Sequence, residues 1–202
     1  MDRILKVFRC EKFLALLSIT LLVLVTYAPL IPQLGYYRDD WYLIWSGSTQ
    51  GASSIIPLFS SDRPFMGVIY SIEYSLLGDS PIAWHLYAFL LRLFGAFSLL
   101  WLLRMIWPEK RFGTTAITLL FLVYPGFLQQ PSANTFQNHL MTYLLAILSI
   151  ALMVKALQAK DRLIQIVLFT VSLPLTLGYL LIYEYFIGLE GLRLLVLWLL
   201  SQ

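Results

Sequence analysis

The feature that most limits the fold of this chain is the length of its uncharged apolar runs. The first run, FLALLSITLLVLVTYAPLIPQLG, extends from Phe13 to Gly35 without a charged residue. A helix needs about 20 apolar residues to cross the hydrocarbon core of a bilayer. A helix also satisfies its own backbone hydrogen bonds, which lipid cannot do. This run therefore predicts a membrane-spanning helix, and it is too long for the apolar part of a cleavable signal peptide.

The composition extends this prediction to the whole chain. Of the 202 residues, 59% are hydrophobic and only 12% are charged, whereas soluble domains carry about 25% charged residues. We therefore predict an all-α, polytopic helical membrane protein that forms a single transmembrane module over residues 1–202. Six spans are expected: Phe13 to Leu34, Ile82 to Leu103, Phe112 to Gln130, Phe136 to Val154, Leu163 to Tyr183, and Phe186 to the C-terminus.

The final span has no basic residues after it, since the sequence ends in VLWLLSQ. Basic residues commonly flank the cytoplasmic ends of spans. We therefore expect the chain to be a fragment of a longer protein.

The connection between the first two spans, residues 35–81, is long and rich in aromatic residues, so we expect short helices within it. In SDRPFMGVIYSIEYSLLGD, Asp62 suits the N-cap of a helix, Pro64 its first turn and Gly78 its end. An apolar stripe at helical spacing predicts a helix that lies in the membrane interface. The alternative is that this helix is a seventh membrane span. The stripe consists of Phe65, Ile69, Ile72 and Leu76.

The distribution of basic residues favours six spans over seven. Lys and Arg near span ends accumulate on the cytoplasmic side of a membrane. Six spans place all five lysines on that side, whereas a seventh span would move two of the three basic clusters outside. The outer side then collects most of the acids, so we expect carboxylate chemistry there: Asp39, Asp40, Asp62, Glu73, Asp79, Glu184 and Glu190.

Asp39 and Asp40 follow the first span within YYRDDWYLIW. Adjacent residues on a helix point about 100° apart, so at most one of them is expected to face a given reacting atom. One interpretation is that they solvate or cap a helix end. The other is that one of them is a general base or a cation ligand at a cavity on the outer side. The residues alone leave open which of the two acids would act, and we predict Arg38 as an interfacial anchor.

Arg92 lies near the middle of the second span, and His85 lies two turns earlier on the same face. An ionised side chain at this depth is costly unless it meets a partner or a polar cavity. Arg92 could pair with Glu184 or Glu190, or its forked guanidinium could bind a phosphate. His85 could be a packing residue or a ligand.

The connection between the third and fourth spans, YPGFLQQPSANTFQNHL, has no acidic or basic residue other than His139 but is dense in amides. Amides offer both donors and acceptors, which suits hydroxyl-rich ligands, although any polar loop can contain them. Near the last span, Glu190 and Arg193 are spaced i,i+3 and can neutralise each other. The amides are Gln129, Gln130, Asn134, Gln137 and Asn138.

Three segments carry a family resemblance: RDDWY after the first span, RPFMG in the interfacial segment, and AWHLYAFLLRLFGAFSLLWLL with basic residues after it. Taken in this order, they resemble those of the C-type membrane glycosyltransferases. The resemblance is to their protein-mannosyltransferase and aminoarabinose-transferase branch. It implies transfer of a sugar from a polyprenyl-phosphate carrier to an acceptor glycan, lipid or protein on the periplasmic or luminal side. It also implies that Asp39 occupies the position of the general base and that Asp40, in the second position of the pair, is its helper. Relatives carry a further acid between spans three and four, where this chain has amides and His139, so the resemblance leaves open whether a divalent metal is the cofactor. Relatives are also longer, so the resemblance implies that this chain is the N-terminal core of a longer enzyme.

The resemblance and the residue patterns together define a candidate site. A non-catalytic flippase or transporter for lipid-linked saccharides and a structural assembly subunit remain the alternatives. The charges give no indication of nucleic-acid binding, because they separate into a basic inner side and an acidic outer side. We expect Asp39 and Asp40 to be catalytic, and Arg92, His85, Arg63, His139, Gln130 and Glu184 to bind substrate.

Overall fold

The structure, a computed structural model, describes residues 2–124 and 131–201, with side chains for residues 11–124 and 131–200. Throughout these residues every regular element is helical, which confirms the predicted all-α class. Four helical segments are long and apolar enough to cross a membrane. They are α1 (Asp2–Tyr27) with its continuation η1 (Ala28–Gln33), α4 (Pro81–Ile106), α6 (Ala133–Gln158) and α7 (Arg162–Ile182).

The third and sixth expected spans are shorter helices. α5 (Arg111–Leu122) has 12 residues and α8 (Gly188–Ser201) has 14. Twelve residues rise about 18 Å, less than the hydrocarbon thickness of about 30 Å. α5 ends before Tyr124, which precedes a proline in the sequence, and a residue in that position disfavours the helical conformation. The expected end of this span at Gln130 lies outside the described residues.

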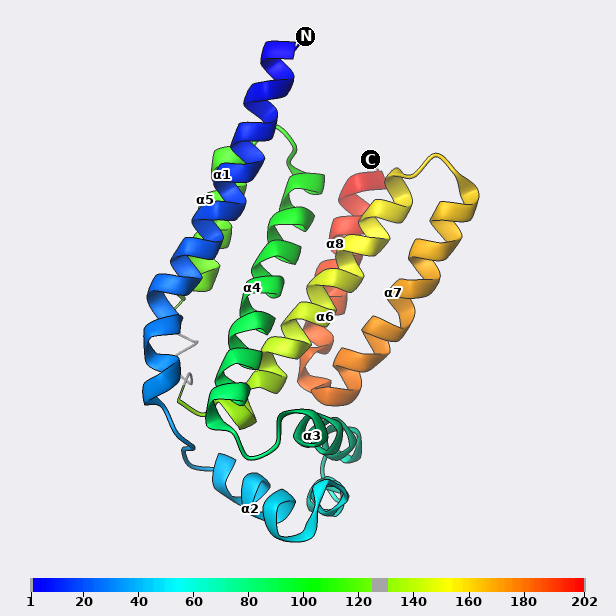
Figure 1. The fold of residues 1–202 in the computed structure, drawn as a ribbon. Helices are drawn as coiled ribbons and strands as arrows, with labels where there is room; N and C mark the ends of the chain where they lie inside the picture. The colour runs from blue at the N-terminus through cyan, green and yellow to red at the C-terminus, as the bar shows by residue number, and fades with distance from the viewer. Residues whose placement is uncertain (1, 125–130, 202) are drawn as a thin grey trace.

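The six helices run alternately up and down (Figure 1). α1 descends from the N-terminus, α4 returns, and α5, α6, α7 and α8 continue the alternation. α4 packs against α6, and α6 packs against α7. The start of α1 and the end of α8 lie at the same end of the bundle, while α2 (Asp40–Gln50) and α3 (Pro64–Leu77) lie across the opposite end.

This arrangement separates the charges. The connections after α4 and after α6 lie near the start of α1, and we call this the basic end; it carries Arg104, Lys110, Arg111, Lys155, Lys160 and Arg162. The end covered by α2 and α3 is the acidic end, and it carries Asp39, Asp40, Asp62, Glu73, Asp79 and Glu184. The structure thus brings together acids that are far apart in the sequence.

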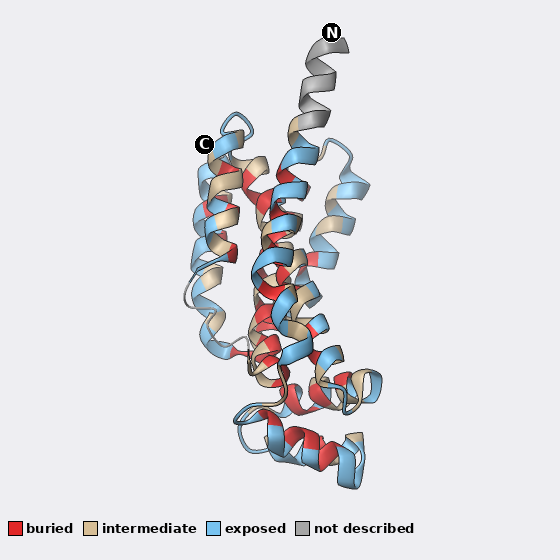
Figure 2. Cartoon of the chain, turned by 60° about the vertical axis from the view of Figure 1, so that its left-hand side comes forward, coloured by how far each residue is buried: buried red, intermediate tan, exposed pale blue. Residues whose placement is uncertain are grey.

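The long helices bury their inner sides and leave apolar side chains on their outer sides (Figure 2). Ile19 and Val23 of α1 are fully buried, whereas Val25 on the same helix is 74% exposed. α7 exposes a row of large apolar residues along most of its length. Contiguous apolar surfaces of this kind are rare in soluble monomers, and lipid is the solvent that suits them.

The connection between α1 and α4 contains helices, as predicted. α2 and α3 are joined by η2 (Ala52–Phe59), which packs on α3. α3 begins at Pro64 and ends at Leu77, and the next residue, Gly78, has a φ of +59°, a conformation that glycine adopts readily. The predicted cap at Asp62 is wrong. The N-cap position is Arg63, no side chain caps the helix, and the Asp62 carboxylate lies 3.0 Å from the Arg63 guanidinium instead.

Candidate functional site

An open pocket lies at the acidic end, between the start of α2 and the first turns of α6. Its cavity volume is ≈ 340 Å³. Arg38 has a positive φ of 49°, and the resulting sharp turn precedes Asp39 and the start of α2. Asp39 is exposed, and no hydrogen bond or ion pair of its side chain occurs within the described residues. The pocket is lined by Arg38, Asp39, Ser132, Thr135, Phe136 and His139.

Asp40, the second member of the acidic pair, is fully buried and fully engaged. Its Oδ1 accepts hydrogen bonds from the backbone N–H of Thr135 at 2.8 Å and from the Thr135 hydroxyl at 2.7 Å. Its Oδ2 accepts a bond from the backbone N–H of Tyr37 at 3.2 Å. Burial raises the pKa of Asp40, although the bonds from Thr135 and Tyr37 oppose that shift. Asp40 therefore anchors the start of α2 to the first turn of α6, and only Asp39 is open to a ligand.

His139 forms another wall of the pocket and is held by aromatic rings. It stacks on Phe136 with ring centroids 4.8 Å apart and lies 4.3 Å from the ring of Tyr183. Its Nε2 is 2.9 Å from the hydroxyl of Tyr185. These contacts from α6 and from the α7–α8 turn fix the imidazole beside the pocket.

Arg63 and Glu184 lie close to this aromatic group without lining the pocket. The Arg63 guanidinium is 5.3 Å from the centroid of the Tyr183 ring, on which His139 also packs. Arg63 Nε lies 3.8 Å from the carboxylate of Glu184, which is itself largely exposed. The structure thus connects Arg63 and Glu184 to His139 through Tyr183.

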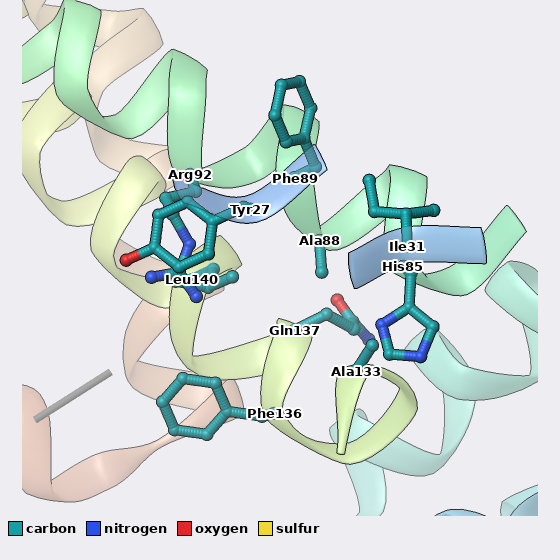
Figure 3. A pocket seen from close by; sticks show the side chains of 10 residues that line it. All are labelled: Tyr27, Ile31, His85, Ala88, Phe89, Arg92, Ala133, Phe136, Gln137 and Leu140. Carbon is teal, nitrogen blue, oxygen red and sulfur yellow. The ribbon is translucent and has the colours of Figure 1, made fainter. Parts of the chain in front are cut away.

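His85 and Arg92 line a second, much smaller cavity between α1, α4 and α6 (Figure 3). The Arg92 guanidinium lies 4.0 Å above the ring of Tyr27, and His85 Nε2 is 3.1 Å from the carbonyl oxygen of Gly35. The predicted shared face of His85 and Arg92 is therefore confirmed. Phe136 lines both this cavity and the open pocket.

The size of the second cavity limits its ligands. Its cavity volume is ≈ 20 Å³, which accommodates about one water molecule. A phosphate is larger. Glu184 and Glu190, the acids expected as partners of Arg92, lie against Arg63 and Arg193 respectively. In this structure Arg92 is a buried cation that packs on an aromatic ring.

The amides that the structure describes do not form a ligand-binding loop. Asn134, Gln137 and Asn138 lie on α6 and are buried. Gln129 and Gln130 lie outside the described residues. Within the described part of the chain, no three His, Cys, Asp or Glu side chains are arranged so that they could hold a metal ion.

Sequence reasoning missed two residues that organise the acidic end. Thr135 binds Asp40, and Glu73 is buried between α3, α4 and α6. Met66, Tyr70 and Glu73 follow one another at spacings of four and three residues, and this face of α3 is buried while Ile72 and Leu76 of the apolar stripe are exposed. That spacing marks a second helical face in the sequence, but the packing of α4 and α6 decides that this face is the buried one.

Comparison with known proteins gives no match: no protein-family model, curated protein or solved structure is significantly similar to this chain.

Proposed function

We propose that this protein is a membrane glycosyltransferase that moves a sugar from a polyprenyl-phosphate carrier to an acceptor hydroxyl. The observation that carries the proposal is the division of the acidic pair. Asp40 is locked to Thr135, while Asp39 stands exposed in an open pocket together with Arg38 and His139. A carboxylate without a partner beside a guanidinium is suited to base catalysis next to a departing anion.

The reaction assigns one task to each side chain. Asp39 accepts the proton of the acceptor hydroxyl as the hydroxyl oxygen forms a bond with the anomeric carbon of the sugar. The bond between that carbon and the phosphate oxygen breaks, and its electron pair leaves with the lipid phosphate. The Arg38 guanidinium lines the same pocket and stabilises the phosphate charge. This assigns to Arg38 the anion-binding role that the sequence suggested for Arg92.

A lipid-linked donor needs an apolar surface beside the pocket. A second open hollow of ≈ 300 Å³ is lined by Tyr143, Tyr185, Phe186, Gly188 and Leu189. Tyr185 belongs to this hollow and also contacts His139 of the first pocket. The two hollows are thus neighbours, and the mainly apolar second one suits the isoprenoid chain.

The proposed orientation places the basic end in the cytoplasm, because basic residues accumulate there. The pocket then faces the periplasm or lumen, the six helices cross or enter the bilayer, and α2 and α3 lie in the outer interface. Trp41 and Trp45 of α2 are 59% and 61% exposed. Tryptophan at headgroup depth is typical of membrane interfaces.

The test is Asp39→Asn in proteoliposomes supplied with a panel of polyprenyl-phospho-sugars and hydroxyl acceptors. We expect transfer to fall by about 100-fold or more, as for loss of a general base, with an unchanged amount of folded protein. Asp62→Asn is the matched control, because Asp62 is an exposed carboxylate at the same end that lies outside the pocket. Full transfer by Asp39→Asn would contradict the proposal. Movement of lipid-linked saccharide across the vesicle membrane without any transfer would support a transporter instead.

A further inference from the structure

Glu73 is a buried carboxyl group that the proposed reaction does not use. It lies on α3, is 5% exposed, and bonds to two other helices. The hydroxyl of Tyr87 on α4 donates to Oε1 at 3.1 Å, and Nε2 of Gln137 on α6 donates to Oε2 at 2.6 Å. One carboxyl therefore connects the short helix at the acidic end to both central helices of the bundle.

Among the residues whose side chains the structure describes, Glu73 has no positively charged partner. Tyr87 on α4 and Tyr70 on α3 are the titratable groups that interact with it, and the neutral amide of Gln137 faces it from α6. None of the ion pairs within the described residues includes Glu73. An ionised carboxylate buried without a cation is strongly disfavoured.

The opposite face of α3 is suited to lipid. Phe65, Ile72 and Leu76 are 36%, 57% and 79% exposed. The buried face of α3 holds Met66 and Tyr70 beside Glu73. A helix with an apolar outer face remains in the membrane interface when its buried face loosens, because lipid covers the apolar side chains that are uncovered.

The docking of α3 is connected to the open pocket through one residue. The Tyr70 hydroxyl donates to the carbonyl oxygen of Thr135 at 3.0 Å. The N–H and hydroxyl of the same threonine bind Asp40, and Thr135 lines the pocket beside Asp39. A shift of α3 thus acts directly on a residue of the pocket wall.

We propose that Glu73 is a proton-binding site that keeps α3 docked on α4 and α6 while it is protonated and releases α3 when it ionises. This inference does not depend on the proposed transferase activity. It concerns the position of a helix, which can be measured without a substrate.

The direction of the pH dependence follows from burial. Desolvation raises the pKa of Glu73 from 4.5 to about 8, against the opposing bonds from Tyr87 and Gln137. A carboxyl that is exposed after release ionises near its ordinary pKa, so the released form binds fewer protons between these two values. Docking is therefore most stable below about pH 4.5, weakens as the pH rises, and is weakest above about pH 8.

Hydrogen–deuterium exchange of α3 amides in nanodiscs tests the proposal, with the rates corrected for the intrinsic pH dependence of exchange. Between about pH 5 and about pH 9 we expect the protection of α3 to fall, by up to about a thousandfold. Glu73→Gln mimics the protonated acid and should give protection that is independent of pH. Asp62→Asn changes an exposed carboxylate beside α3 and should keep the wild-type curve.

A second variant keeps the test decisive if Glu73→Gln does not fold. Tyr87→Phe removes a hydrogen bond that favours the ionised carboxylate, so the midpoint of the transition should move to higher pH. Wild-type protection that does not change with pH, a Glu73→Gln variant that keeps the wild-type curve, or an unshifted midpoint in Tyr87→Phe would each overturn the proposal.

Discussion

The carboxylate of Asp40 binds both the backbone N–H and the hydroxyl of Thr135, a residue 95 positions later in the chain. Two elements that flank the pocket, the start of α2 and the first turn of α6, are thereby held together by one buried side chain. The same contact leaves Asp39 as the open member of the pair.

Asp40→Asn should destabilise the protein more than Asp39→Asn. The amide nitrogen of asparagine cannot accept the bond that Tyr37 N–H donates to Oδ2, and an unsatisfied buried group costs about 1–3 kcal/mol. Asp39 is exposed, so its replacement should change the free energy of unfolding by about 0.5 kcal/mol or less. Thermal unfolding in detergent measures both. Equal shifts in the unfolding temperature for the two variants would rule out the anchoring role of Asp40.

Tyr27 should stabilise the bundle through its hydroxyl and through its ring. Its hydroxyl donates to the carbonyl oxygen of Leu122 at 2.6 Å, and its ring lies 4.0 Å from the Arg92 guanidinium carbon. Tyr27→Phe keeps the ring and should cost about 1 kcal/mol, whereas Tyr27→Leu should cost roughly 1–2 kcal/mol more through loss of the cation–π contact. Chemical denaturation of the two variants provides the comparison. If phenylalanine and leucine have the same effect, the ring does not stabilise Arg92.

Arg193 should be essential for the docking of α8. It is 4% exposed, lies 3.0 Å from Glu190, and donates to the hydroxyl oxygen of Ser149 on α6 at 2.6 Å. Arg193→Ala removes the charged donor from Glu190 and the guanidinium donor from Ser149, while Tyr179 still donates to Glu190; the change should cost about 3 kcal/mol, as for a broken buried ion pair. Ser149→Ala serves as the smaller control, at about 1 kcal/mol. Unfolding measurements that give the two variants equal losses would contradict this account.

Gly67 should not tolerate a side chain. A Cβ at this position would lie 2.7 Å from the carbonyl oxygen of Ile56, so η2 would have to move away from α3. Gly67→Ala should therefore cost about 1–3 kcal/mol. Gly95→Ala is the matched control, because a Cβ there meets nothing within 4 Å and should stabilise α4 by up to about 1 kcal/mol. The difference in unfolding temperature between these variants is the measurement, and similar values would refute the close contact.

Features that depend on nearby residues were predictable from the sequence. The helix from Pro64 to Gly78 has the start and end that its proline and glycine suggest. The i,i+3 pair of Glu190 and Arg193 forms at 3.0 Å. Both depend on the backbone geometry of a few consecutive residues, which a sequence pattern reflects directly.

Features that depend on distant partners were not predictable in the same way. Asp62 suits an N-cap, but its carboxylate turns to Arg63, and Arg63 in turn reaches Glu184. The sequence also did not indicate which face of α3 is buried against the protein, because an interfacial helix has apolar residues on its lipid side as well as towards the protein. Choosing between these two faces requires the positions of α4 and α6.

By itself, the sequence determined the solvent and the class of fold. Runs of uncharged apolar residues of membrane length can satisfy their backbone only as helices, and the clustering of lysines divides the chain into two kinds of connection. Only the tertiary structure decided that Asp40 is locked and Asp39 open, and that Glu73 is buried. The physical reason is that hydrogen bonding and desolvation of a carboxyl depend on groups that folding brings together from distant parts of the chain.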